Sequence, residues 1–155
     1  MAPSKTAAYR LHKVIRPAQP DDLEAVQDLL REYAASLQLD LSFQDFEFEL
    51  ADPLEFYELV LLAEEGCVAL RRLDEYTCEM KRLYVRPSAR GGGLGRQLAE
   101  AVIAAAQTRG YKRMLLDTLP TMDAARALYR SLGFRETEQY RFNPVPGTTF
   151  LELEL

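Results

Sequence analysis

A run of three glycines, followed by a leucine and a fourth glycine, separates a strand-like segment from a helix-like segment. Residues 77–85 alternate enough to predict a strand, which Pro87 ends. Residues 90–95 read Arg-Gly-Gly-Gly-Leu-Gly, and a helical apolar pattern follows from Leu94 to the capping Gly110. The unpaired backbone N–H groups at the start of a helix form the positive end of the helix dipole, and they can bind an anion. This segment therefore predicts a cradle for a phosphate or pyrophosphate.

Two arginines, Arg90 and Arg96, add positive charge at both rims of the predicted cradle. The segment is not a Walker A loop, because no Gly-Lys-Ser/Thr follows it. It is also a weak dinucleotide fingerprint, since its strand lies late in the chain. Two alternatives stay open from the residues alone: a flexible loop that only caps the helix, and a loop that binds ATP or GTP.

The rest of the chain alternates between strand and helix patterns. Strands are predicted over residues 9–16, 59–64, 66–73, 77–85, 112–117, 134–138 and 149–155, and helical patterns begin at Pro20, Ser42, Leu94 and Ala124. Consecutive strands favour antiparallel hairpins, and the strand-helix-strand unit over residues 77–117 favours one parallel pair with a right-handed crossover. We therefore expect an α/β (mixed α+β) fold with a mixed, mostly antiparallel sheet of about seven strands and helices on both faces.

The chain length of 155 residues suits one domain. We expect residues 1–8 to form a flexible tail and residues 9–155 a single domain. The formal net charge of −5 argues against a dedicated nucleic-acid binder. No apolar run approaches the ~20 residues of a membrane span, and residues 1–8 do not form a signal peptide, so a cytoplasmic location is expected.

Few residues could serve metal or histidine chemistry. The chain has two cysteines, Cys67 and Cys78, and they form no CxxC pair. His12 is the sole histidine, so any Ser-His-Asp triad or histidine-based metal site would need it. We expect no metal, a structural His12, and reduced cysteines that pack as small apolar side chains.

Two segments together resemble the GNAT superfamily of N-acetyltransferases. Residues 90–95 fit its Arg/Gln-x-x-Gly-x-Gly/Ala motif, and residues 79–87 resemble the strand that precedes that motif. Residues 127–134, Ala-Leu-Tyr-Arg-Ser-Leu-Gly-Phe, are similar to its second signature, Leu-Tyr-x-x-x-Gly-Phe. The resemblance covers residues 14–155. It implies a splayed parallel strand pair that forms a cleft for CoA.

The resemblance also implies an activity and a role for individual residues. The activity is direct transfer of an acetyl group from acetyl-CoA, the cosubstrate, to a primary amine on a small molecule or peptide, in a ternary complex. Tyr129 would protonate the departing thiolate, and Glu79 would be the general base. Backbone groups of Leu83, Tyr84 and Val85 would meet the pantetheine and the acetyl oxygen, and Arg90, Gly91, Gly92, Gly93, Leu94, Gly95 and Arg96 would hold the pyrophosphate.

Several alternatives accompany these implied roles. Tyr129 could be a core residue, and Glu79 could pair with Arg71 or Arg82. Met122 stands where many members carry asparagine, which puts one CoA contact in question. A non-catalytic acyl-CoA-binding regulatory module with the same fold is the alternative function. The two N-terminal helices and the loop over residues 140–147 are expected to form the part of the site that binds the acceptor. Members of the superfamily often form homodimers, so a homodimer is possible for this chain.

Overall fold

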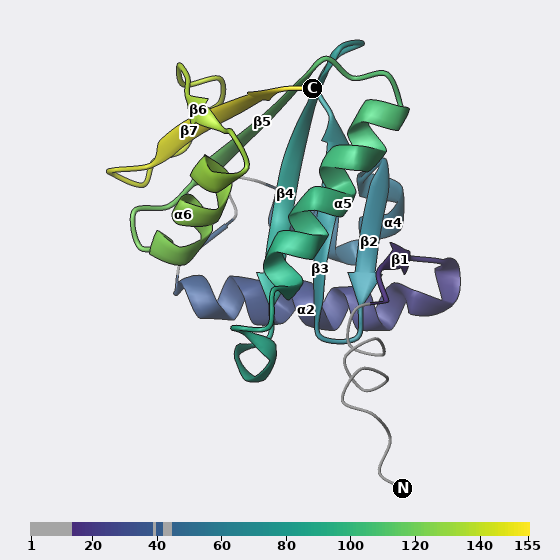
Figure 1. Ribbon diagram of the computed structural model, residues 1–155. Coiled ribbons are helices and arrows are strands. Elements are labelled where there is room, and N and C mark those ends of the chain that lie inside the picture. The colour runs from purple at the N-terminus through teal and green to yellow at the C-terminus, as the bar shows by residue number, and fades with distance from the viewer. Residues whose placement is uncertain (1–13, 39, 42–44) are drawn as a thin grey trace, which may run out of the picture.

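The computed structural model describes residues 14–38, 40–41 and 45–155, and one mixed sheet organises them. The strand order is β1-β2-β3-β4-β5-β7-β6, and every neighbouring pair is antiparallel except β4 and β5, which confirms the expected fold class (Figure 1). The strands are β1 (Arg16–Pro17), β2 (Leu59–Ala63), β3 (Gly66–Arg72), β4 (Thr77–Val85), β5 (Arg113–Thr118), β6 (Arg135–Glu136) and β7 (Thr149–Glu154).

Helices cover both faces of this sheet. Figure 1 shows α2 crossing behind the strands, while α5 and α6 lie in front of them. The helices are α2 (Leu23–Leu37), α3 (Phe46–Ala51), α4 (Pro53–Phe56), α5 (Leu94–Thr108) and α6 (Asp123–Ser131), with short 3-10 turns η1 (Pro20–Asp22) and η3 (Pro87–Ala89). None of the helices in the described ranges is long and apolar enough to cross a membrane.

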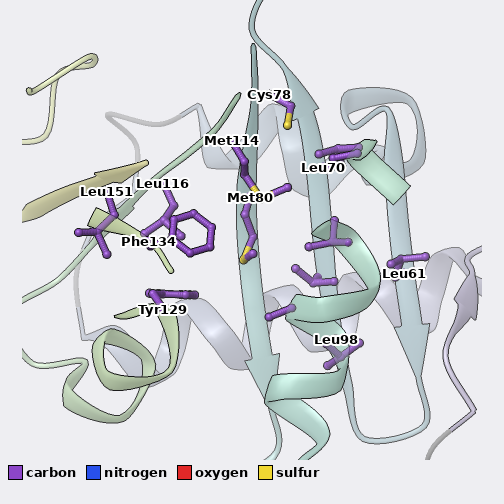
Figure 2. Packing of buried hydrophobic residues seen from close by; sticks show 14 of the residues in the cluster. Leu61, Leu70, Cys78, Met80, Leu98, Met114, Leu116, Tyr129, Phe134 and Leu151 are labelled. Atoms are coloured by element: carbon purple, nitrogen blue, oxygen red, sulfur yellow. The ribbon is translucent and has the colours of Figure 1, made fainter. Parts of the chain in front are cut away.

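The two faces of the sheet carry separate apolar cores. In front, Leu98 of α5 and Tyr129 of α6 pack with Met80 and Met114 from the sheet (Figure 2). Behind, Leu29 of α2 packs with side chains from β2 to β4. The periodic apolar residues of each helix supply its buried face, as expected for an amphipathic helix. The sheet is therefore held from both sides, and its strands are fixed relative to the helices.

β4 and β5 pair over only three residues each and then separate. The parallel register joins Thr77–Glu79 to residues 113–115 of β5, and no pairing follows toward the carboxyl ends. β4 also carries a bulge opposite β3, where Arg82 adopts a left-handed backbone conformation with φ of 59°. Bulges redirect side chains and are frequent beside functional sites. The bulge lies where the two parallel strands move apart.

The N-terminal region differs in detail from the sequence prediction. Among the described residues the first strand is β1, at the sheet edge, where Pro17 can be tolerated. Most of the predicted strand over residues 9–16, together with His12 and the predicted helix start at Ser42, lies outside the described residues. The short helix α4 was not predicted. It begins at Pro53, and Asp52 caps it by accepting a hydrogen bond from the backbone N–H of Glu55.

Candidate active site

A cavity of about 600 Å³ occupies the opening between β4 and β5. Its lining comes from both faces of the sheet. Tyr33 and Ser36 of α2 line it from behind, and Gly95 of α5 with Leu128 of α6 line it from the front. The loop over residues 140–147 contributes Asn143. The cavity thus extends through the sheet where the parallel strands part, at their carboxyl ends, which is where open α/β sheets bind ligands.

The glycine-rich segment forms the front rim of this cavity. Gly91 and Gly93 have φ values of 89° and 86°, a left-handed conformation that glycine adopts without strain. Gly93 is the N-cap of α5, so the N–H groups of the first helical turn point toward the rim without partners within the helix. This geometry can hold an anionic group such as a pyrophosphate.

Arg90 ties the glycine-rich segment to the end of β4. Its Nε donates a hydrogen bond to the carbonyl oxygen of Val85 at 2.9 Å. Its guanidinium lies 5.8 Å from the ring centroid of Tyr84. The carbonyl of Val85 is thus already engaged, which leaves its N–H as the group that could polarise an acyl oxygen. Of the residues expected to bind CoA, the cavity lining includes Leu83, Tyr84, Val85, Arg90, Gly91, Gly93, Leu94 and Gly95.

Two of the expected CoA-binding residues do not line the cavity. Gly92 is exposed at the outside of the loop. Arg96 is also exposed; it pairs with Glu100 at 3.1 Å and donates a hydrogen bond to the hydroxyl of Ser131. The structure therefore places Arg96 on the surface beside the rim, between α5 and α6.

Tyr129 both packs in the core and faces the cavity. Its ring meets Phe134 edge-on at 5.7 Å between centroids, and only 7% of the residue is exposed. Burial raises the pKa of the Tyr129 hydroxyl above its usual range, with smaller contributions from Tyr33 and Asp117. The phenol consequently stays protonated at neutral pH. Tyr129 is therefore both a residue of the front core and a residue of the cavity lining.

Glu79 lies away from the main cavity. It is fully buried, and its carboxylate accepts hydrogen bonds from the Tyr140 hydroxyl and from the guanidinium of Arg141, which lies 3.1 Å away. Glu79 borders a smaller hollow behind the sheet. Its ion-pair partner in the described part of the chain is Arg141 rather than Arg71 or Arg82. Glu79 therefore fastens the loop before β7 to β4, and this geometry favours a positioning role over that of a base.

Three further polar residues, Lys81, Asp117 and Asn143, line the cavity, and the sequence predicted none of them as a catalytic residue. Lys81 of β4 is 5% exposed, and burial lowers the pKa of Lys81 to about 8. Asp117 of β5 accepts a hydrogen bond from the Asn143 side-chain amide at 3.1 Å, and all three residues line the cavity. A lysine inside an apolar strand and an aspartate at the carboxyl end of a parallel strand are the signals that could have identified them.

Arg82 and Glu49 form a buried ion pair beside the cavity. The guanidinium donates to both carboxylate oxygens, with a shortest distance of 2.8 Å, and the two side chains are 2% and 1% exposed. The rings of Tyr33 and Phe46 lie against the guanidinium at 5.3 and 5.5 Å. The pair attaches α3 to the bulge of β4 and so shapes the rear wall of the cavity.

Comparisons with known proteins agree with this geometry. An uncharacterized N-acetyltransferase of Schizosaccharomyces pombe is 40% identical over 147 residues, 88% of this chain and 90% of the relative. A candidate acyl-CoA N-acyltransferase structure from Klebsiella pneumoniae has a TM-score of 0.72 at 28% identity, covering 94% of this chain and 99% of the other. A Salmonella typhimurium protein solved with its cofactor acetyl-CoA has a TM-score of 0.65 at 27% identity, covering 91% and 92%.

The splayed parallel pair, the glycine-rich rim and these relatives define an acyl-CoA-dependent N-acetyltransferase. Enzymes of this class use a CoA thioester as cosubstrate and an amine as acceptor. The model of the acetyltransferase (GNAT) family matches residues 23–134, which is most of the chain. The chain therefore belongs to the GNAT family, which confirms the resemblance seen in its two sequence motifs.

Proposed function

We propose that this enzyme transfers the acetyl group of acetyl-CoA directly to a primary amine of a small molecule or peptide, with both substrates bound together. The observation that carries the proposal is that the end of β4, the glycine-rich rim and Tyr129 all line one cavity that reaches both faces of the sheet. The CoA pyrophosphate fits the front rim, and the acceptor has the rear opening beside α2. Neither ligand has to leave before the other enters.

Each reacting group has a partner of suitable chemistry in this arrangement. The backbone N–H of Val85 polarises the thioester carbonyl, as in other sites that stabilise a developing oxyanion. The amine nitrogen attacks the carbonyl carbon, and the carbon–sulfur bond then breaks. Tyr129 gives its hydroxyl proton to the departing thiolate, because burial keeps the phenol protonated until that step. Positioning both substrates in one cavity supplies the remainder of the rate enhancement.

Acetyl-CoA is expected to raise the melting temperature of the protein, whereas ATP is not. The cradle continues into a cavity that suits a pantetheine arm, and the chain lacks the lysine of a Walker A loop. Ligand at 100 times its dissociation constant stabilises the folded state by ~2.7 kcal/mol. Thermal unfolding in the presence of each ligand measures the shift in melting temperature. An ATP shift as large as the acetyl-CoA shift would contradict the assignment. A screen of amines for release of free thiol then separates an enzyme from a non-catalytic module.

Glu79→Gln is expected to raise the KM for the acceptor by up to about tenfold and to leave kcat nearly unchanged. The substitution removes the charge that holds Tyr140 and Arg141, so the loop that carries Asn143 loosens at the rear opening. Steady-state kinetics across pH test this. If Glu79 were the general base, kcat would instead fall by ~10²–10⁴ and the acid limb of its pH profile would disappear.

A further inference from the structure

The proposed reaction needs a group that takes a proton from the attacking nitrogen. Tyr129 gives its proton to the thiolate, and Glu79 lies outside the main cavity, where Tyr140 and Arg141 hold its carboxylate. Among the described residues that line the cavity, Asp117 of β5 is the one carboxylate. A carboxylate within reach of a reacting amine can act as a general base. The lining itself therefore offers Asp117 for this task.

The other ionisable groups of this lining are poor bases at neutral pH. Burial is the main cause that raises the pKa of Tyr33, Tyr84 and Tyr129, so these hydroxyls stay protonated. Burial lowers the pKa of Lys81 to about 8, so most of this lysine is still protonated at pH 7, and it already has interactions within the protein. The two arginines of the lining do not lose their protons in proteins.

Strand β5 holds Asp117 at the edge of the gap between the parallel strands. The pairing of β4 with β5 ends at Leu115, two residues earlier, whereas on its other side Asp117 stays paired with Phe150 of β7. Leu116 packs in the front core, so by alternation Asp117 points to the rear. The carboxylate is therefore carried by a paired strand and faces the rear opening, which the proposed function gives to the acceptor.

Asn143 fixes the orientation of this half-buried carboxylate. The backbone N–H of Val145 donates to Asn143 Oδ1 at 3.0 Å, which turns the amide nitrogen of Asn143 toward Asp117. That nitrogen donates to Asp117 Oδ2 at 3.1 Å. Hydrogen bonding to the Asp117 side chain within the described ranges involves Oδ2 alone. Oδ1 is therefore left for a ligand in the cavity.

Asp117 also lies within electrostatic reach of two tyrosines on opposite faces of the sheet. Burial is the largest cause of the raised pKa of both Tyr33 and Tyr129, and the charge of Asp117 adds to it in each case. Tyr33 belongs to the rear helix α2, and Tyr129 to the front helix α6. Asp117 is thus close both to the rear opening and to the proposed acid, as a base that serves the amine has to be.

We infer that Asp117 is the general base of the transfer, and that its carboxylate holds the acceptor amine and takes the proton that the nitrogen loses on acylation. The inference rests on the proposed function and adds a catalytic residue to it. The acceptor reacts as its free amine. As the carbon–nitrogen bond forms, the nitrogen becomes positively charged and acidic, and it gives one proton to Asp117. The carbon–sulfur bond breaks, and the thiolate takes the Tyr129 proton. Asp117 then releases its proton to solvent, and solvent returns one to Tyr129.

Replacing Asp117 with asparagine tests this assignment. The asparagine keeps an oxygen that can accept from the Asn143 amide, and it lacks the charge and the basicity of the carboxylate. We expect kcat/KM for the free amine to fall ~10²-fold or more, while the dissociation constant of acetyl-CoA stays within a few fold. Asp28→Asn makes the same change on the exposed face of α2, outside the cavity lining, and should alter neither value.

Chemical rescue distinguishes a base from a carboxylate that only supports the structure. Asp117→Ala removes the carboxylate from the cavity wall and leaves space there. Formate should raise kcat/KM of this variant at least about tenfold, because a small carboxylate can enter that space and take the proton. Formate should not accelerate Tyr129→Phe, in which the missing group is an acid. Formate that accelerates neither variant, or both equally, would overturn the inference.

The possible failures are distinguishable from one another. If Asp117→Asn turns over at the wild-type rate while the chemical step is rate-limiting, Asp117 is not the base and the inference is wrong, although the proposed function stands. If its affinity for acetyl-CoA falls as much as its rate, Asp117 shapes the cavity instead, which also overturns the inference. If the wild type binds acetyl-CoA and no amine of any kind releases thiol, the proposed function is wrong and the inference falls with it.

Discussion

Replacing Tyr129 with phenylalanine is expected to lower kcat at least about tenfold while the affinity for acetyl-CoA stays within a few fold. The substitution keeps the ring that packs edge-on against Phe134 and removes only the hydroxyl of a residue that lines the cavity. General-acid assistance contributes ~10²–10⁴ in rate, and it acts in the transition state rather than in the ground state. Steady-state and single-turnover kinetics with an acceptor from the amine screen measure the effect.

Tyr111→Phe provides the matched control for this experiment. Tyr111 is another buried tyrosine of the front core, but its hydroxyl donates to Glu58 at 2.7 Å and it does not line the cavity. Its removal should leave kcat unchanged. If Tyr129→Phe turns over at the wild-type rate while the chemical step is rate-limiting, Tyr129 is a core residue alone and the thiolate takes its proton from water.

Replacing Glu49 with glutamine is expected to destabilise the fold by about 3–5 kcal/mol. The change leaves the Arg82 guanidinium buried without its counter-ion, because both members of the pair are almost fully removed from water. For a chain of this length the loss corresponds to a fall in melting temperature of roughly 6–20 °C. Chemical and thermal unfolding measure the two quantities.

Asp28→Asn breaks an ion pair of the same type in a different setting. Asp28 pairs with Arg31 on the exposed face of α2, where both side chains are more than half exposed. Solvent-exposed pairs contribute only ~0.2–1 kcal/mol, so this variant should unfold almost as the wild type does. Equal destabilisation by Glu49→Gln and Asp28→Asn would mean that burial does not govern the contribution of the Arg82–Glu49 pair.

The sequence predicted the central part of the fold well, because the local signals there agree with one another. The bounds predicted for β4 are those observed, since a period-two pattern ends at a proline and a glycine-rich segment follows. The second signature, over residues 127–134, was also informative, because it predicted a helix that ends just before Phe134. The short α4 escaped prediction because one turn of helix carries no periodic pattern.

The acceptor side of the site was harder to predict, because its geometry depends on contacts between distant residues. The helix α2 and the loop that bears Asn143 were expected there and do line the cavity. The partners of Glu79 lie about sixty residues further along the chain, and no local pattern joins them. Lys81 and Asp117 can be placed at one cavity only when the register of β4 with β5 and the end of that pairing are known.

The left-handed residue Arg82 of β4 changes which side chains of that strand face the front of the sheet and which face the rear. Before the bulge, side chains at odd positions face the rear; after it, Tyr84 faces the rear and Leu83 the front. On the proposed function, acetyl-CoA binds at the front rim and the acceptor at the rear opening, so the two sides of the strand would serve different substrates. Substitutions of rear-facing residues would then change which amines are used and leave the glycine-rich rim unchanged. The choice of acceptor would in that case be able to change separately from the transfer of the acetyl group.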